Sequence, residues 1–198
     1  SDMDILEQLT VEIIREKAHV IENSSCIVVD TNLTEEVLYH LLKDYKNKDF
    51  FLDTVSTSKA MKVSDFIGAF HTIKPNRLEA EKLSGIKIRD NNDLRKVSEY
   101  FLKKGVKNVY ISLGEEGVYY ADGETSGIFK IPRVKVVSAT GAGDAFMAGL
   151  VYGYLNDLKI EESTKLASAA AVMALSHENT INPMMSLEGI NKIIKESM

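Results

Sequence analysis

Short strand-like runs alternate with amphipathic segments along the first half of the chain. The runs at 26–29 and 50–52 are continuously apolar, which is typical of strands buried on both faces of a parallel sheet. Apolar residues at helical spacing follow, with Thr34 and Asn76 as predicted N-caps and Gly85 and Gly105 as stop signals. The predicted strands are 26–29, 50–52, 71–74 and 109–113, and the predicted helices are 10–21, 34–47, 77–83 and one from 90 or 92 to 104.

This alternation predicts βαβ units with right-handed crossovers. We therefore expect an α/β fold with three layers, in which a mostly parallel, Rossmann-like sheet carries helices on both faces. The remaining predicted strands are 118–120, 128–131 and 133–137, and helices are expected from the glycines after 140 to about 155, from 162 to 176 and after a Ser186 cap. Polar residues that follow the apolar runs are expected at the carboxyl edge of the sheet, where open α/β sheets bind ligands.

One turn stands out for its chemistry, in the sequence Thr140-Gly141-Ala142-Gly143-Asp144. Two glycines between a strand and a helix let the backbone approach a ligand closely, and the amide groups of the first helical turn form an anion site. A carboxylate beside such a site fits a base that takes a proton from a hydroxyl attacking a phosphoryl group. The alternative is that Asp144 is an ordinary acid in a first helical turn.

Two common phosphate-binding motifs are excluded at this turn. A Walker A loop requires Lys followed by Ser or Thr after the glycines, and no such pair is present. The dinucleotide fingerprint requires a third glycine where Phe146 stands. A dinucleotide-binding domain also needs a glycine-rich turn after the first strand, and residues 30–32 are Asp-Thr-Asn.

Composition narrows the class of protein further. The 198 residues predict one domain, 1–198, and a net charge of −5 argues against electrostatic binding of a nucleic acid polymer. A single cysteine, Cys26, excludes an internal disulfide and a cysteine-based zinc site. No apolar run is long enough to span a membrane and no signal peptide is evident, so we expect a cytoplasmic protein.

Residues 140–146 resemble the C-terminal signature of the ribokinase (PfkB) family of carbohydrate and nucleoside kinases, and the resemblance runs over essentially the whole chain. It implies a ribokinase-like fold, ATP and Mg²⁺ as cofactors, Asp144 as the catalytic base and Gly141, Ala142 and Gly143 as the anion hole. Thr140 belongs to the same motif and is expected near ATP. The family pattern usually begins Asp-Thr where this chain has Ser138-Ala139, so the resemblance leaves the family's monovalent-cation site open.

The resemblance also assigns roles near the phosphates. Asn76 and Glu79 match the family's Asn-x-x-Glu element, in which the Glu helps hold Mg²⁺ through water. The alternative for this pair is a plain capping box. Ser112, Gly114 and Gly117 match a Ser-Leu-Gly-x-x-Gly element near the ATP phosphates, and the alternative there is a tight hairpin turn.

Further residues are expected near the adenine and the acceptor. Ala170, Met173, Asn179 and Asn182 are candidates for the base pocket, although small residues at 167–174 equally predict close helix packing. Asn32 would lie near the sugar. Within the family, residues 53–56 and 74–81 look most similar to pseudouridine kinases.

The expected function is transfer of the ATP γ-phosphoryl group to a hydroxyl of a sugar or nucleoside, with pseudouridine preferred. Ribokinase-like enzymes normally carry roughly a hundred further residues before this point, in the size range of a small domain, so we expect an N-terminally truncated kinase. The alternative is a nucleotide-binding fragment without activity of its own. Missing strands would leave an open sheet edge, which predicts a homodimer.

Overall fold

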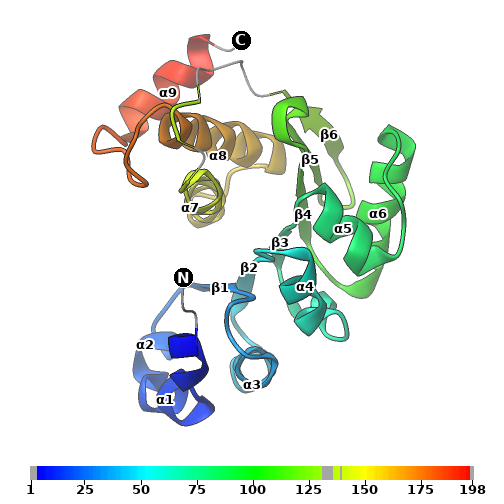
Figure 1. Cartoon of the computed structure of the whole chain (residues 1–198), viewed down its shortest axis with the longest axis vertical. Helices are drawn as coiled ribbons and strands as arrows, with labels where there is room; N and C mark the ends of the chain where they lie inside the picture. Colours follow the sequence, from blue (N-terminus) through cyan, green and yellow to red (C-terminus); the bar gives the residue numbers. More distant parts are fainter. Residues whose placement is uncertain (1–3, 131–135, 139, 197–198) are drawn as a thin grey trace. The chain divides into compact units, whose positions relative to one another are not determined.

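The computed structural model describes residues 4–130, 136–138 and 140–196, and these form two compact units (Figure 1). The first unit spans Ser1–Ser112 together with Ala121–Glu124. The second spans Leu113–Tyr120 together with Thr125–Met198.

The first unit contains four parallel strands that neighbour one another in chain order. β1 pairs with β2 so that Cys26 lies opposite Asp49, β2 pairs with β3 through Phe51 and Thr72, and β3 pairs with β4 through Thr72 and Asn108. The strands are β1 (Cys26–Asp30), β2 (Asp49–Asp53), β3 (Thr72–Lys74) and β4 (Asn108–Ser112). All four predicted strands of this region are confirmed within one or two residues.

Helices of the first unit precede β1 or connect the four strands. Because each strand lies beside the preceding one in a constant direction, right-handed crossovers place the connecting helices on one face of this sheet. The helices are α1 (Val11–Glu16), α2 (Ala18–Glu22), α3 (Glu35–Asp44), α4 (Thr57–Ala60), α5 (Arg77–Ser84) and α6 (Asn91–Lys104), with 3-10 turns η1 (Asp4–Gln8), η2 (Met61–Val63) and η3 (Ile67–Ala69).

Capping explains where these helices begin and end. The Thr34 hydroxyl accepts the Val37 N–H at 3.2 Å, and Gly85 ends α5 with φ of 72°. These predictions are confirmed. The predicted helix over 10–21 is wrong in one respect, because it breaks at Lys17 into α1 and α2, and the Thr10 side chain makes no capping bond.

The core of the first unit lies between the sheet and its helices. Its largest side chains are less than 2% exposed and come from strands and helices that are distant in sequence: Leu38, Phe50, Phe51, Leu52, Phe70 and Phe101. Burial of each such side chain contributes on the order of 1.5–3 kcal/mol. This core fixes the strand ends that carry the polar residues described below.

The second unit is dominated by helices. Its two strands, β5 and β6, neighbour each other. α7 packs closely on α8, because a Cβ added at Gly149 would lie only 2.5 Å from Ala167 Cα. The elements are η4 (Gly114–Glu116), β5 (Val118–Ala121), β6 (Ser126–Phe129), α7 (Ala142–Leu155), α8 (Ile160–Leu175) and α9 (Leu187–Glu196).

The strand predicted over 133–137 is not observed at its last two residues, because Val136 and Val137 are not in a strand. Its first three residues, 133–135, lie outside the described residues, as does residue 131 of the strand predicted over 128–131. The Val137 N–H donates instead to the Leu175 carbonyl at 2.8 Å, at the end of α8. The other helices and strands predicted for this half are confirmed, as is the α/β class.

His71, just before β3, predicts a pH-dependent stability. Burial lowers the pKa of its imidazole, with a smaller opposing effect from Asp49. A His with a lowered pKa in the folded state is protonated more readily in the unfolded state, so stability is constant above the unfolded pKa of about 6.5 and falls below it. We expect the urea midpoint to fall between pH 7.5 and 5.5, and to fall less in His71→Asn. An equal fall in both proteins would contradict this assignment.

Candidate functional site

Four of the strands in the first unit end in polar residues that lie along one edge of the sheet. Asn32 follows β1, Thr54 follows β2, Asn76 follows β3 and Ser112 ends β4. Asn76 and Ser112 pair as an isolated parallel bridge, and the Ser112 N–H donates to the Pro75 carbonyl at 3.0 Å. The structure therefore brings these two predicted residues side by side at the carboxyl edge, where ligands bind in sheets of this class.

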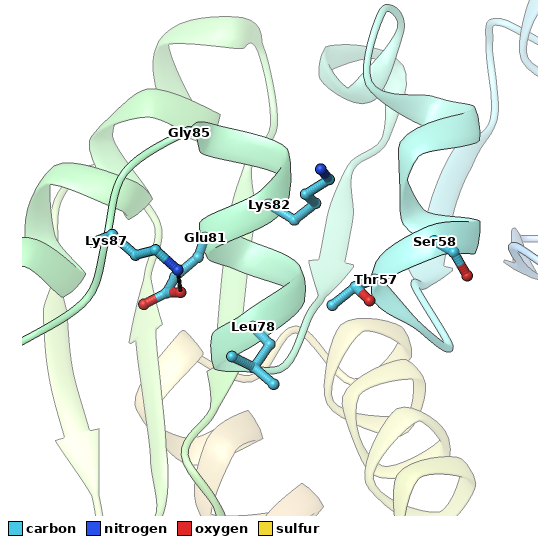
Figure 2. A pocket seen from close by; sticks show the side chains of 7 residues that line it. All are labelled: Thr57, Ser58, Leu78, Glu81, Lys82, Gly85 and Lys87. Atoms are coloured by element: carbon cyan, nitrogen blue, oxygen red, sulfur yellow. Dashed lines mark hydrogen bonds and ion pairs between the residues drawn. The ribbon is translucent and has the colours of Figure 1, made fainter.

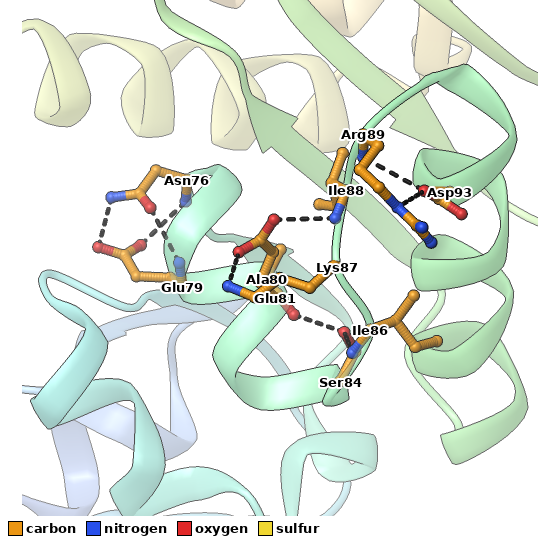
Figure 3. Close-up of polar contacts among 10 residues, drawn as sticks. All are labelled: Asn76, Glu79, Ala80, Glu81, Ser84, Ile86, Lys87, Ile88, Arg89 and Asp93. Carbon is orange, nitrogen blue, oxygen red and sulfur yellow. Dashed lines mark hydrogen bonds and ion pairs between the residues drawn. The ribbon is translucent and has the colours of Figure 1, made fainter.

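Glu79 lies one helical turn after Asn76, and the two side chains hold each other (Figure 3). The Asn76 Oδ1 accepts the Glu79 N–H at 3.0 Å, while Glu79 Oε2 accepts the Asn76 N–H at 2.9 Å and Oε1 accepts from Asn76 Nδ2 at 2.7 Å. The capping-box interpretation is thus confirmed as geometry. The cap also fixes the Glu79 carboxylate at the sheet edge, so the same geometry is compatible with the predicted role of holding Mg²⁺ through water.

Thr54 adds a third donor to Glu79 that the sequence reasoning missed. Its hydroxyl donates to Glu79 Oε2 at 2.6 Å, and the Thr54 carbonyl accepts the Thr31 hydroxyl at 2.6 Å. Both threonines are fully buried, and Glu79 is 3% exposed. The sequence showed a polar residue after an apolar run, in the segment 53–56 that resembles pseudouridine kinases, and neither signal reveals that the hydroxyl points inward.

The turn that directs Thr54 inward is strained. Val55 has φ of 56°, a left-handed conformation that is rare for a β-branched residue. Its N–H donates to Asp53 Oδ1 at 3.1 Å, and Asp53 Oδ2 pairs with Lys74 at 2.8 Å. This ion pair occupies the Lys74 ammonium group at the end of β3.

The hydrogen bonds that Glu79 already accepts, and the side chains around it, limit the way in which its carboxylate could bind a cation. Its Oε2 accepts two hydrogen bonds and its Oε1 one, which leaves room at Oε1 for one more donor such as water. Among the described residues no group of three His, Cys, Asp or Glu side chains is placed to ligate a metal directly. Mg²⁺ usually keeps several waters and uses one or two carboxylates plus substrate phosphates. Glu79 fits that mode, through water, and does not fit an all-protein cage.

Asn32 is held by its neighbours within the first unit. Its Nδ2 donates to Asp30 Oδ2 at 2.7 Å, and its Oδ1 accepts from Lys59 Nζ at 2.5 Å. Lys59 is a second residue that the sequence reasoning missed. Both ends of the Asn32 amide are therefore oriented at the end of β1, which leaves the sugar contact as a prediction.

The glycine turn opens α7 in the second unit. Gly141 is its N-cap, with φ of 85°, and the first helical bond runs from the Ala145 N–H to the Gly141 carbonyl at 2.9 Å. The preceding amide groups of the first turn have no helical acceptor and lie at the positive end of the helix dipole. Asp144 is exposed, and within the described part of the chain its carboxylate makes no hydrogen bond or ion pair.

The second unit also brings this turn against the loop after α8. A Cβ at Gly141 would collide with the Thr180 carbonyl, so only glycine fits. Thr140 is exposed beside it, and its N–H donates to Ser138 Oγ at 3.3 Å. The turn is therefore fixed by both its conformation and its packing.

The residues predicted to line a base pocket divide into packed and exposed ones. Ala170 and Met173 are buried in a cluster with Leu166, Ala169 and Ile190, between α8 and α9. Asn182 is 6% exposed; its Nδ2 donates to the Met173 carbonyl at 2.8 Å and its Oδ1 accepts the Met184 N–H at 2.9 Å. Asn179 is exposed. These contacts favour the packing interpretation, and contact with a base stays a prediction.

Gly114 and Gly117 belong to the turn between β4 and β5. Gly114 has φ of 64° with open space where a Cβ would stand, whereas a Cβ at Gly117 would collide with the Phe129 carbonyl. Gly117 is thus required by packing against β6. Gly114 is required only by its backbone conformation, and it leaves room for a close ligand.

A separate hollow of about 650 Å³ lies between α4 and α5 in the first unit (Figure 2). It contains none of the predicted site residues. Glu81 lies at its rim, where hydrogen bonds from Lys87 and from the Ile88 N–H lower the pKa of its carboxyl. The lining residues are Thr57, Ser58, Leu78, Glu81, Lys82, Gly85 and Lys87.

The predicted site residues thus form two sets. Asn32, Asn76, Glu79 and Ser112 lie at the strand ends of the first unit. The second unit holds Gly114, Gly117, Thr140, Gly141, Ala142, Gly143, Asp144, Ala170, Met173, Asn179 and Asn182.

None of the helices that the structure describes has both the length and the apolar character needed to cross a membrane.

The chain is similar to several known kinases. The chain is 37% identical to the pseudouridine kinase of Escherichia coli K12 over 198 residues, which are the whole chain and 63% of that protein. A candidate sugar kinase from Clostridium perfringens is 44% identical, with a TM-score of 0.90 over 94% of this chain and 59% of that one. Arabidopsis thaliana ribokinase, solved with ribose and ATP, has the same fold at 21% identity, with a TM-score of 0.81 over 91% of this chain and 59% of that one.

The chain therefore spans a little under two thirds of the length of these relatives. The sequence profile of the pfkB family of carbohydrate kinases matches residues 2–187. That match covers well over half of the chain. The ribokinase-like fold expected from the sequence is confirmed, and the chain belongs to the pfkB family of carbohydrate kinases.

Proposed function

We propose that this chain transfers the γ-phosphoryl group of ATP to a hydroxyl of a sugar or nucleoside, with pseudouridine as the preferred acceptor. The observation that carries the proposal is the start of α7, where exposed Asp144 adjoins amide groups without helical acceptors. Amide groups in such a turn stabilise charge on a moving phosphoryl group, and a nearby carboxylate can take the proton of the attacking hydroxyl.

The remaining residues have supporting roles in this proposal. Glu79 would hold Mg²⁺ through water, with Asn76 fixing its carboxylate. When bound with ATP, Mg²⁺ supplies positive charge that offsets the charge of the phosphates. Ser112, Gly114 and Thr140 would contact the nucleotide, and Asn32 the acceptor. Pseudouridine as acceptor is supported by the 37% identity to the Escherichia coli enzyme.

A second function is favoured by the length of the match. Because the chain spans 63% of the pseudouridine kinase, it could bind ATP without phosphorylating an acceptor by itself. This nucleotide-binding module differs from the kinase in one measurable respect, which is turnover.

ADP release with Mg²⁺ and ATP, across pseudouridine, other nucleosides and free sugars, tests the proposal. Release that depends on one acceptor, and is fastest with pseudouridine, is the expected result. ATP binding without release for any acceptor would favour the nucleotide-binding module. Absence of ATP binding would contradict both functions.

We further propose a homodimer and a cytoplasmic location. β1 is the first strand in the sheet order, and among the described strands it pairs with β2 alone. Val28, in the middle of β1, is 50% exposed. An exposed strand edge favours pairing with a second copy of the chain.

A further inference from the structure

The Glu79 carboxylate is held more firmly than its capping role requires. A capping box needs only the reciprocal bonds between Asn76 and Glu79, and both are present. The third donor, Thr54, comes from the end of a different strand and donates at 2.6 Å. Glu79 is also 3% exposed, and among the described residues no cation pairs with it.

A buried carboxylate without a positive partner is costly, because it loses its hydration. Hydrogen bonds to a charged acceptor are short and strong, and they offset part of this cost. Thr54 and Asn76 bind Oε2, and the Asn76 side chain binds Oε1 once. The carboxylate is thereby fixed in rotation, with one position on Oε1 left for another donor.

The conformation of the segment after β2 places the Thr54 hydroxyl beside Glu79. Thr31 donates to the Thr54 carbonyl at 2.6 Å, which anchors the Thr54 backbone from the neighbouring strand. The chain then turns sharply through Val55 at φ of 56°, so that Thr54 is fully buried while Val55 is 43% exposed. Strain of this kind persists where the surrounding structure fixes it, and it gathers at functional sites.

We propose that Thr54 is a positioning residue that orients Glu79 toward the water shell of Mg²⁺ bound with ATP. This inference rests on the proposed function and adds a residue outside the family's Asn-x-x-Glu element. Thr54 itself touches neither the metal nor the nucleotide. Partners that orient a direct metal ligand typically change metal affinity by about 10–100-fold when they are removed, and the effect is smaller for a carboxylate that acts through water.

Thr54→Val tests the proposal, since valine has nearly the same shape and lacks the hydroxyl. ATP binding is measured by calorimetry over a series of Mg²⁺ concentrations. We expect Thr54→Val to require about 5–10-fold more Mg²⁺ for half-maximal enhancement of ATP binding, toward the low end of the range for partners of direct ligands. Affinity for ATP without Mg²⁺ should not change. Thr54→Ser, which keeps the hydroxyl, should stay within about 2-fold of wild type.

Thr164→Val is the matched control. Thr164, in α8, is equally buried and donates at the same distance, but to the Ile160 carbonyl of its own helix instead of Glu79. Its urea midpoint should fall about as far as that of Thr54→Val, with little change in the Mg²⁺ requirement. If Thr54→Val does not fold, Thr54→Cys supplies a weak donor of similar size.

Two results would overturn the inference. One is an unchanged Mg²⁺ requirement in Thr54→Val, and the other is an equal shift in Thr164→Val, which would indicate a purely structural role. If wild type does not bind ATP at all, the proposed function fails, and this inference fails with it.

Discussion

Replacing Asp144 with asparagine is expected to lower the rate of ADP release by roughly 10²–10⁴-fold, with the affinity for ATP nearly unchanged. Asparagine has almost the same shape as aspartate and cannot accept the proton of an attacking hydroxyl. The carboxylate is exposed in the first turn of α7 and has no partner among the described residues, so no folded contact is lost. The measurement is ADP release with the acceptor that supports turnover in wild type.

A matched control separates catalysis from helix electrostatics. Glu188 is also an acid in a first helical turn, at the start of α9. Each acid contributes typically 0.3–1 kcal/mol through the helix dipole, so Asp144→Asn and Glu188→Gln should lower stability by similar small amounts. Only Asp144→Asn should lower turnover, by roughly 10²–10⁴-fold. Wild-type turnover in Asp144→Asn would reject the base assignment and leave Asp144 as an ordinary first-turn acid.

Gly149→Ala is expected to destabilise the protein by about 2–3 kcal/mol, although alanine is the better helix former. Propensity alone would raise the stability by about 1 kcal/mol. The added Cβ would lie 2.5 Å from Ala167 Cα and 3.0 Å from the Ala167 nitrogen, which are backbone atoms of α8. Because backbone atoms cannot rotate away, α7 and α8 must separate. The resulting loss of stability from overpacking is larger than the gain from the higher helix propensity of alanine.

Gly189→Ala in α9 is the control for Gly149→Ala. Its added Cβ would meet Met173 Cε at 2.9 Å, which is the end of a flexible side chain that can move. Urea unfolding should therefore show a small change or a gain for Gly189→Ala and a clear loss for Gly149→Ala. An equal gain for both would mean that the two helices are not held at this distance in solution.

Local sequence signals predicted the helices and strands of the first unit well, because the boundaries of each depend on residues that are close in sequence. Thr34, Asn76 and Asp90 cap helices with their own side chains, and Gly85 takes the left-handed conformation that ends α5. Apolar runs of the right length predicted the four parallel strands. Propensity and burial point the same way at these positions, so single-sequence reasoning sufficed.

The chemistry of the site was harder to predict where it depends on contacts distant in sequence. The bond from Thr54 to Glu79 joins residues 25 positions apart, and that from Lys59 to Asn32 joins residues 27 apart. Asn182 looked available for a ligand, yet its side chain ties its own loop to the end of α8. No local pattern distinguishes an inward hydroxyl or a self-satisfied amide from an exposed one.

The strand order of the first unit also has a consequence for how the chain folds. Phe51 pairs with Thr72, and Thr72 pairs with Asn108, so each strand finds its partner in the next strand to be synthesised. Among β1 to β4, no strand has to insert between two that are already paired. Each new pairing therefore closes only the loop between two consecutive strands, which lowers the entropic barrier that slows parallel sheets. These four strands can pair in the order of synthesis, with the strand end that carries Thr54 in place before that of Asn76.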